Sequence, residues 1–126
     1  MKNVNPAVTA TMRDRPPRNE IEVEARRQVV TLARSMLAEK LSFMEGAVQV
    51  VSLKTRIGGV ANRDKDFDAF LVISSETDHL PLHGQRHLWS ERAVAALAPD
   101  FERVQQWASG FAPQACIKLI ERFSHD

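Results

Sequence analysis

The chain of 126 residues contains a single cysteine, Cys116, which excludes a disulfide within the chain. A lone thiol is compatible with a reducing compartment. The apolar runs, such as residues 69–73 and 93–98, are far shorter than the roughly 20 residues that span a bilayer. The N-terminus carries a lysine but lacks the apolar core of a secretory signal. These absences together predict a cytoplasmic protein.

The chain also lacks an excess of charge of one sign, because it has 17 lysines and arginines and 16 acidic residues, which give a net charge of +1. A balanced surface does not favour nucleic acid or a membrane as the partner. Gly58 and Gly59 lack the lysine and hydroxyl residue of a phosphate loop, and no serine stands in a nucleophile elbow. Cys116 lies in an apolar helical segment, where a buried, inert thiol is expected. The sequence therefore gives no catalytic set.

Residues 1–19 are predicted to be a flexible leader, and residues 20–126 a helical domain. The leader is polar, contains three of the six prolines and shows no apolar periodicity. A weaker alternative is a nucleic-acid arm formed by the arginines of the leader and of the first helix, Arg13, Arg15, Arg18, Arg26 and Arg27. A solvated tail is favoured, because no aromatic side chain stands among the leader arginines to stack on a base.

Apolar spacing predicts two helices in the first half of the domain, over residues 20–40 and 42–57. Asn19 is expected to cap the first helix. The apolar face of this helix is expected to comprise Ile21, Ala25, Val29, Leu32 and Met36. Arg26 lies within reach of Glu22 for an ion pair one turn apart. Ser42 and Glu45 have the spacing of a capping box, and Gly46 permits close contact between helices. Gly58 and Gly59 are expected to end the second helix.

The second half is predicted to be helical as well. The run A-F-L-V-I, which follows Asp64, Asp66 and Asp68, fits a helix or a buried strand. We favour a helix because no second strand could pair with it. A short helix is expected after Ser90, and a longer one after Pro99 that is kinked or split near Gly110 and Pro113. The predicted fold is all-α, a single compact domain of four to six helices.

Residues 74–89 are the most informative segment, since they hold three of the four histidines, two carboxylates, an arginine and a tryptophan. Metal binding is one interpretation: three histidines spaced by four residues, with Glu76 or Asp78 adding an oxygen ligand, form a candidate site at His79, His83 and His87. Pro81 and Gly84 interrupt any continuous helix there, so the favoured interpretation is a turn held by an ion pair between Arg86 and a carboxylate. We therefore expect no metal or other cofactor.

The line S-E-T-D-H-L-P-L-H-G-Q-R-H-L-W resembles a small bacterial family of unknown function. In that family, S-E-T-D-x-L-P-x-G-x-x-R-x-x-W follows a helix with an F-x-E-G-A motif, here F-M-E-G-A from Phe43 to Ala47. The resemblance covers about residues 20–123, and this chain has one additional residue before Gly84. It implies a characteristic patch that comprises Glu45, Glu76, Asp78, Pro81, Gly84, Arg86 and Trp89.

The function expected from these features is binding of another protein, or of a second copy of the chain, by an immunity-like or regulatory module without catalysis. The alternative is a metal-dependent enzyme or metal-binding module that uses the three histidines with Glu76 or Asp78.

Overall fold

The computed structural model describes residues 15–60, 64–78, 80 and 90–124. These residues form six helices and no strand: α2 (Glu20–Leu37), α3 (Phe43–Ile57), α4 (Lys65–Glu76), α5 (Glu91–Ala96), α6 (Ala98–Ala108) and α7 (Ala112–Phe123). The all-α prediction is confirmed, and the A-F-L-V-I run lies in α4, so its strand alternative is wrong. Over the described ranges, no helix has the length and apolar content needed to cross a membrane.

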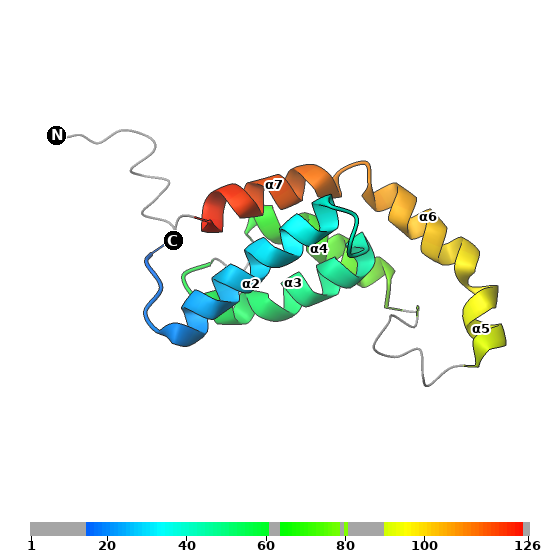
Figure 1. The fold of residues 1–126 in the computed structure, drawn as a ribbon, viewed down its shortest axis with the longest axis horizontal. Helices are drawn as coiled ribbons and strands as arrows, with labels where there is room; N and C mark the ends of the chain where they lie inside the picture. Colours follow the sequence, from blue (N-terminus) through cyan, green and yellow to red (C-terminus); the bar gives the residue numbers. More distant parts are fainter. Residues whose placement is uncertain (1–14, 61–63, 79, 81–89, 125–126) are drawn as a thin grey trace.

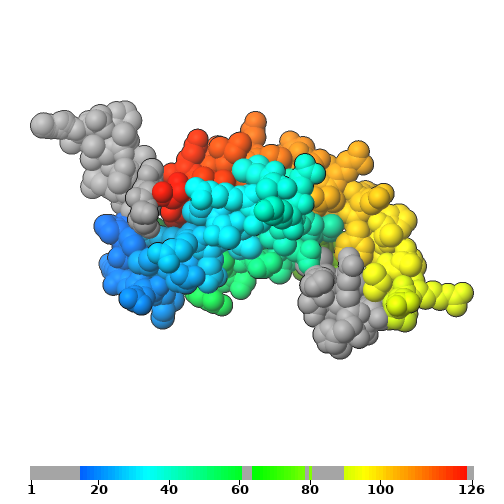
Figure 2. Space-filling model, in the orientation of Figure 1, coloured from blue at the N-terminus to red at the C-terminus, as the bar shows by residue number. Residues whose placement is uncertain are grey.

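Four of the helices form a bundle, and the other two form an arm at one end of it. Helix α2 packs against α3 and α7, and α3 packs against α4 (Figure 1). The α5–α6 arm, Glu91–Ala108, projects beyond the bundle, as the yellow end of the molecule in Figure 2 shows. The predicted break in the last apolar segment is confirmed, because residues 109–111 separate α6 from α7.

Side-chain caps begin four of the helices. Asn19, Ser42 and Ser90 accept hydrogen bonds from backbone N–H groups of α2, α3 and α5, as the sequence predicts. Asp64 caps α4 in the same way. Each cap satisfies a donor that the helix itself leaves unpaired, and therefore fixes where the helix begins.

Helix α2 ends at Leu37, three residues before the predicted end. The Glu39 N–H donates to Met36 O, and the Lys40 N–H donates to Ser35 O over 2.9 Å, which is the pairing of a Schellman motif. This motif places Glu39 in the left-handed region, at φ 61°. Apolar periodicity cannot reveal such an end, because glutamate is not the residue that usually adopts this conformation.

The core lies between the four bundle helices, with Phe67, Phe70 and Ile73 of α4 fully buried. Cys116 of α7 is also buried, as predicted, and burial raises the pKa of its thiol to about 11. Ile21 does not belong to the core: it is 66% exposed, and the buried face of α2 includes Val30 and Ala33 instead. The predicted apolar face of α2 is therefore wrong at Ile21 and omits Val30 and Ala33.

Gly46 brings α3 into close contact with the end of α2, as the sequence predicts. A Cβ atom at this position would lie 2.6 Å from Met36 Cγ. Met36 is 1% exposed, and its sulfur lies 4.0 Å from Cys116 Sγ, so its side chain has little room to move. The α2–α3 contact therefore depends on the missing side chain at Gly46.

We expect Gly46→Ala to destabilise the protein. Alanine favours a helix by about 1 kcal/mol over glycine, but overpacking a core costs about 1–3 kcal/mol, so the free energy of unfolding should fall by roughly 1 kcal/mol. Urea titration measures this change. Gly110→Ala is the control, because a Cβ there would meet only Trp107 O at 3.4 Å. If Gly46→Ala is as stable as the parent, the close packing described here is wrong.

A buried ion pair joins the start of α4 to the end of α7. Arg122 donates to both carboxylate oxygens of Asp64, over 2.7 and 2.8 Å, and to Asp66 over 3.0 Å. The side chains of Arg122 and Asp64 are 7% and 4% exposed. An ion pair that holds a turn was predicted at Arg86, which lies outside the described residues. The ion pair of Arg122 was not predicted.

Arg122→Ala should lower the free energy of unfolding by about 3–5 kcal/mol, because it removes the arginine that neutralises the buried Asp64 carboxylate. Arg103→Ala provides the comparison, since the Arg103–Asp100 pair is exposed and its atoms are 3.4 Å apart. Loss of that exposed pair should change stability by less than about 1 kcal/mol. Equal effects of the two substitutions in chemical denaturation would show that the buried pair has no special role.

A second charged cluster lies at the C-terminal end of α3, at the same end of the bundle. Arg26 is 6% exposed and donates to Ile57 O and Gly58 O, so it caps the C-terminus of α3. The predicted Arg26–Glu22 pair is absent from the described contacts: Glu22 instead accepts two hydrogen bonds from Arg15, over 2.8 and 2.9 Å. Two of the arginines in the nucleic-acid alternative, Arg15 and Arg26, are thus bound within the protein itself.

These hydrogen bonds make the contribution of Glu22 depend on pH. Hydrogen bonds from Arg15 and from the Arg18 N–H lower the pKa of Glu22 to about 2. An unfolded glutamate has a pKa of about 4.3, so the ionised carboxylate stabilises the fold above that pH, and this stabilisation is lost as the pH falls toward 2.

The melting temperature of Glu22→Gln should therefore lie below that of the parent above about pH 5, and the difference should shrink between about pH 4.5 and 2. Thermal melts followed by circular dichroism at several pH values test this. Glu20→Gln, which removes an exposed carboxylate from the same helical turn, is the control for a simple change of charge. A difference for Glu22→Gln that is equal at pH 7 and pH 2.5 would contradict the expectation.

Candidate functional site

Most of the predicted patch lies outside the described part of the chain. This holds for Pro81, Gly84, Arg86 and Trp89, and for the three candidate metal ligands, His79, His83 and His87. Over the described residues, no group of three or more histidine, cysteine, aspartate or glutamate side chains is arranged to hold a metal ion. The metal site and the Arg86 pair therefore stay predictions.

The remaining members of the patch lie at one end of the bundle. Glu76 is the last residue of α4, and Asp78 follows it; both are exposed. Because α3 and α4 run in opposite directions, these carboxylates lie at the end where α3 begins (Figure 1). Glu45 lies in the first turn of α3. No described hydrogen bond or ion pair joins Glu45 to either of them.

Among the described residues of this segment, Thr77 and Leu80 are buried, which was not predicted from the sequence. Each is 2% exposed. The Thr77 hydroxyl donates to Ser74 O over 2.9 Å, and its backbone oxygen accepts from the Leu80 N–H. Thr77 therefore ends α4, and the polar residues beside it face outward.

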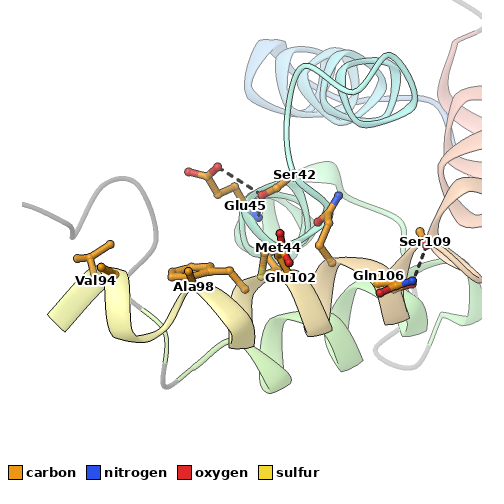
Figure 3. A pocket seen from close by; sticks show the side chains of 11 residues that line it. Ser42, Met44, Glu45, Val94, Ala98, Glu102, Gln106 and Ser109 are labelled. Atoms are coloured by element: carbon orange, nitrogen blue, oxygen red, sulfur yellow. Dashed lines mark hydrogen bonds between the residues drawn. The ribbon is translucent and has the colours of Figure 1, made fainter. Parts of the chain in front are cut away.

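An open groove lies at this same end, between the start of α3 and the α5–α6 arm. Its volume is about 760 Å³. One wall comes from the start of α3 and the other from the arm (Figure 3). The lining residues are Ser42, Met44, Glu45, Val94, Ala95, Ala98, Phe101, Glu102, Gln105, Gln106 and Ser109.

The arm is held against the bundle by one face of α6. Val104 and Ala108 of this face are buried in the core, at 1% and 0% exposure. Gln105 Oε1 accepts a hydrogen bond from the Phe43 N–H over 3.0 Å, so it satisfies a donor in the first turn of α3. This bond joins the two walls of the groove and positions the lining side chains of α6 opposite α3.

The groove is elongated along α6. Its lining residues on this helix and just after it recur at helical spacing, over a stripe that comprises Ala98, Phe101, Glu102, Gln105, Gln106 and Ser109. At 1.5 Å per residue, this stripe is about 16 Å long, or three helical turns. Toward α5 the lining is apolar, and toward Ser109 it is polar. A long, narrow site of this kind fits an extended or helical segment.

Acidic side chains stand on both walls. Glu45 lies on α3 and Glu102 on α6, and the described lining residues include no lysine, arginine or histidine. Arg103, next to Glu102 in the sequence, is not among them and pairs with Asp100. Both charged residues of the described lining are therefore acidic.

The serine hydroxyl groups of the groove make local hydrogen bonds. Ser42 Oγ accepts the Glu45 N–H over 3.0 Å and donates to Glu45 Oε1 over 3.3 Å, which confirms the predicted cap at Ser42. Ser109 Oγ donates to Gln106 O over 2.6 Å. Among the described lining residues, no histidine or lysine stands beside either hydroxyl as a base for nucleophilic catalysis.

Among the described members of the predicted patch, only Glu45 lines the groove. The sequence does contain the pattern that forms the other wall, because residues 98, 101, 102, 105, 106 and 109 are spaced as one helical stripe. Its mixed composition hides it, however, since an apolar stripe is the usual sign of a buried face.

Searches of protein families, curated proteins and solved structures found no match to this chain. The resemblance to the S-E-T-D family therefore stays a prediction, and the groove is the feature from which function is argued.

Proposed function

We propose that this chain is a small protein-binding module, cytoplasmic and immunity-like or regulatory in its role, that holds a segment of another protein in the groove between α3 and the α5–α6 arm. The observation that carries the proposal is the lining stripe along the whole length of α6. A site about three helical turns long matches a secondary-structure element better than a compact metabolite.

The state of α5 supports a binding role. This helix has only six residues, and none of them is buried. So short a helix is marginal by itself, and its stability depends on packing. Val94 and Ala95 of α5 line the groove, so a bound segment would cover apolar surface that the bundle leaves open.

The position of the groove also supports the proposal. It lies at the end of the bundle where α4 ends in Glu76, followed by Asp78, the two described acidic residues of the predicted patch in that segment. Polar residues that follow a helix at an open surface are common in binding sites.

Site-specific photo-cross-linking tests the proposal. A photoreactive phenylalanine at Ala98, in the groove, should give an adduct with a defined protein in the native cells. The same group at Val72, which is 48% exposed on α4, should not give that adduct. Adducts that are identical from both positions, or none from Ala98, would contradict the proposal.

The identified protein should then bind the purified chain in calorimetry, and a groove-filling variant should weaken this binding at least tenfold. Ala95→Trp is that variant, because Ala95 is exposed and lines the groove. Ala96→Trp is its matched control, because Ala96 is the next exposed residue of α5 and does not line the groove. Equal affinities of the two variants would place the binding surface elsewhere.

A further inference from the structure

The end of the bundle opposite the groove holds the side chain of Arg15, in the blue segment of Figure 1 that precedes α2. Four residues surround this side chain where α2 begins and α3 ends: Glu22, Arg26, Gly58 and Gly59. We propose that these four residues, the arginine site, bind an arginine of an extended segment of another protein, and that Arg15 is the internal ligand that such a segment displaces. None of the four is among the described lining residues of the groove, so the inference is independent of the proposed function.

Glu22 binds the guanidinium group with both of its carboxylate oxygens. Arg15 Nη1 donates to Glu22 Oε1 over 2.8 Å, and Arg15 Nη2 donates to Glu22 Oε2 over 2.9 Å. The Arg18 N–H also donates to Glu22 Oε1, over 2.8 Å, and helps to orient the carboxylate. Two parallel hydrogen bonds fit the planar fork of arginine, and the ammonium group of lysine cannot make them. The carboxylate therefore selects arginine over lysine.

Arg26 binds the main chain of the same ligand residue. Its Nη2 donates to Arg15 O over 2.9 Å. Arg26 is 6% exposed, and its hydrogen bonds to Ile57 O and Gly58 O hold it against the end of α3. The arginine site thus contacts a side chain and a carbonyl group at once, and this combination distinguishes an arginine within a peptide from a free guanidinium ion.

The Gly58–Gly59 turn leaves the room that the ligand occupies. A Cβ atom at Gly58 would lie 2.6 Å from Arg15 Nη2, and one at Gly59 would lie 2.7 Å from Arg15 Cγ. Both glycines are in the left-handed region, at φ 75° and 73°, which other residues seldom adopt. The two missing side chains therefore make the wall along which the arginine side chain lies.

The segment that carries Arg15 has the form of a peptide ligand. It precedes α2 and continues with Pro16 and Pro17, and a proline disfavours helical backbone in the residue before it. Arg15 Nη1 also donates to Pro16 O over 3.0 Å. The contacts with Glu22 and Arg26 involve only an arginine side chain and its carbonyl group, so an arginine–proline segment of another chain can make the same contacts. The ligand class is therefore an extended arginine–proline segment.

The peptide acetyl-Arg-Pro-Pro-Ala-amide tests the inference on the full chain, with binding followed through the ¹H–¹⁵N signals of Gly58 and Gly59. Arg15→Ala should bind this peptide about tenfold or more tightly than the parent does, because the internal ligand no longer competes for the site. Arg18→Ala is the matched control, since it removes the same charge from the same segment. Arg18 contributes its backbone N–H to the described contacts, so this variant should bind like the parent.

Two further comparisons test whether arginine itself is recognised. The peptide acetyl-Lys-Pro-Pro-Ala-amide should bind Arg15→Ala about tenfold more weakly than the arginine peptide does. Glu22→Gln, added to Arg15→Ala, should remove the preference for arginine. Arg15→Lys, which keeps a cation on the segment, should also bind the arginine peptide more tightly than the parent does, and it replaces Arg15→Ala if circular dichroism shows that variant to be unfolded.

Three results would overturn the inference: equal affinity of the parent and the Arg15 variants, equal affinity for the two peptides, or no binding to the Arg15 variants. Each of these results leaves the proposed function to be decided by cross-linking from Ala98, which lies at the other end of the bundle.

Discussion

The contact between α6 and the start of α3 is the interaction on which the groove depends. Val104 and Ala108 are buried in the core, and Gln105 accepts the Phe43 N–H. The buried pair holds α6 on the bundle, and the hydrogen bond sets how α6 is rotated about its axis. Since adjacent helical residues point in different directions, the burial of Val104 and Ala108 leaves Phe101, Glu102 and Gln106 facing the open side.

The bundle and the arm have different physical characters. Buried charges join the bundle helices at one end, through Arg122 with Asp64 and through Arg26 with the C-terminus of α3. Satisfied networks of this kind favour one arrangement of the helices. The arm has no such network among its described residues, and α5 has no buried residue. A stable bundle thus carries an arm that gains packing when a segment binds beside it.

Sequence reasoning predicted the features that depend on neighbours in the chain. The caps at Asn19 and Ser42, the glycine contact at Gly46 and the break near Gly110 are local, so their residue types are readable. The pair of Arg122 and Asp64, which are 58 residues apart, could not be predicted in this way. In the sequence, charged residues that pair in the interior cannot be told from charged residues on a solvated surface. The groove escaped for the same reason: its walls come from α3 and α6, and only their packing makes one site.

The central claim is that the face between α3 and the α5–α6 arm receives a segment of another protein. Amide chemical shifts of the ¹⁵N-labelled chain, followed as the partner protein identified by cross-linking at Ala98 is added, test this most directly. The account predicts that the largest changes fall on residues 42–45 and 91–109, with small changes at Leu71 and Val72, the exposed apolar residues of α4. Changes centred on α4, or spread evenly over the surface, would contradict it.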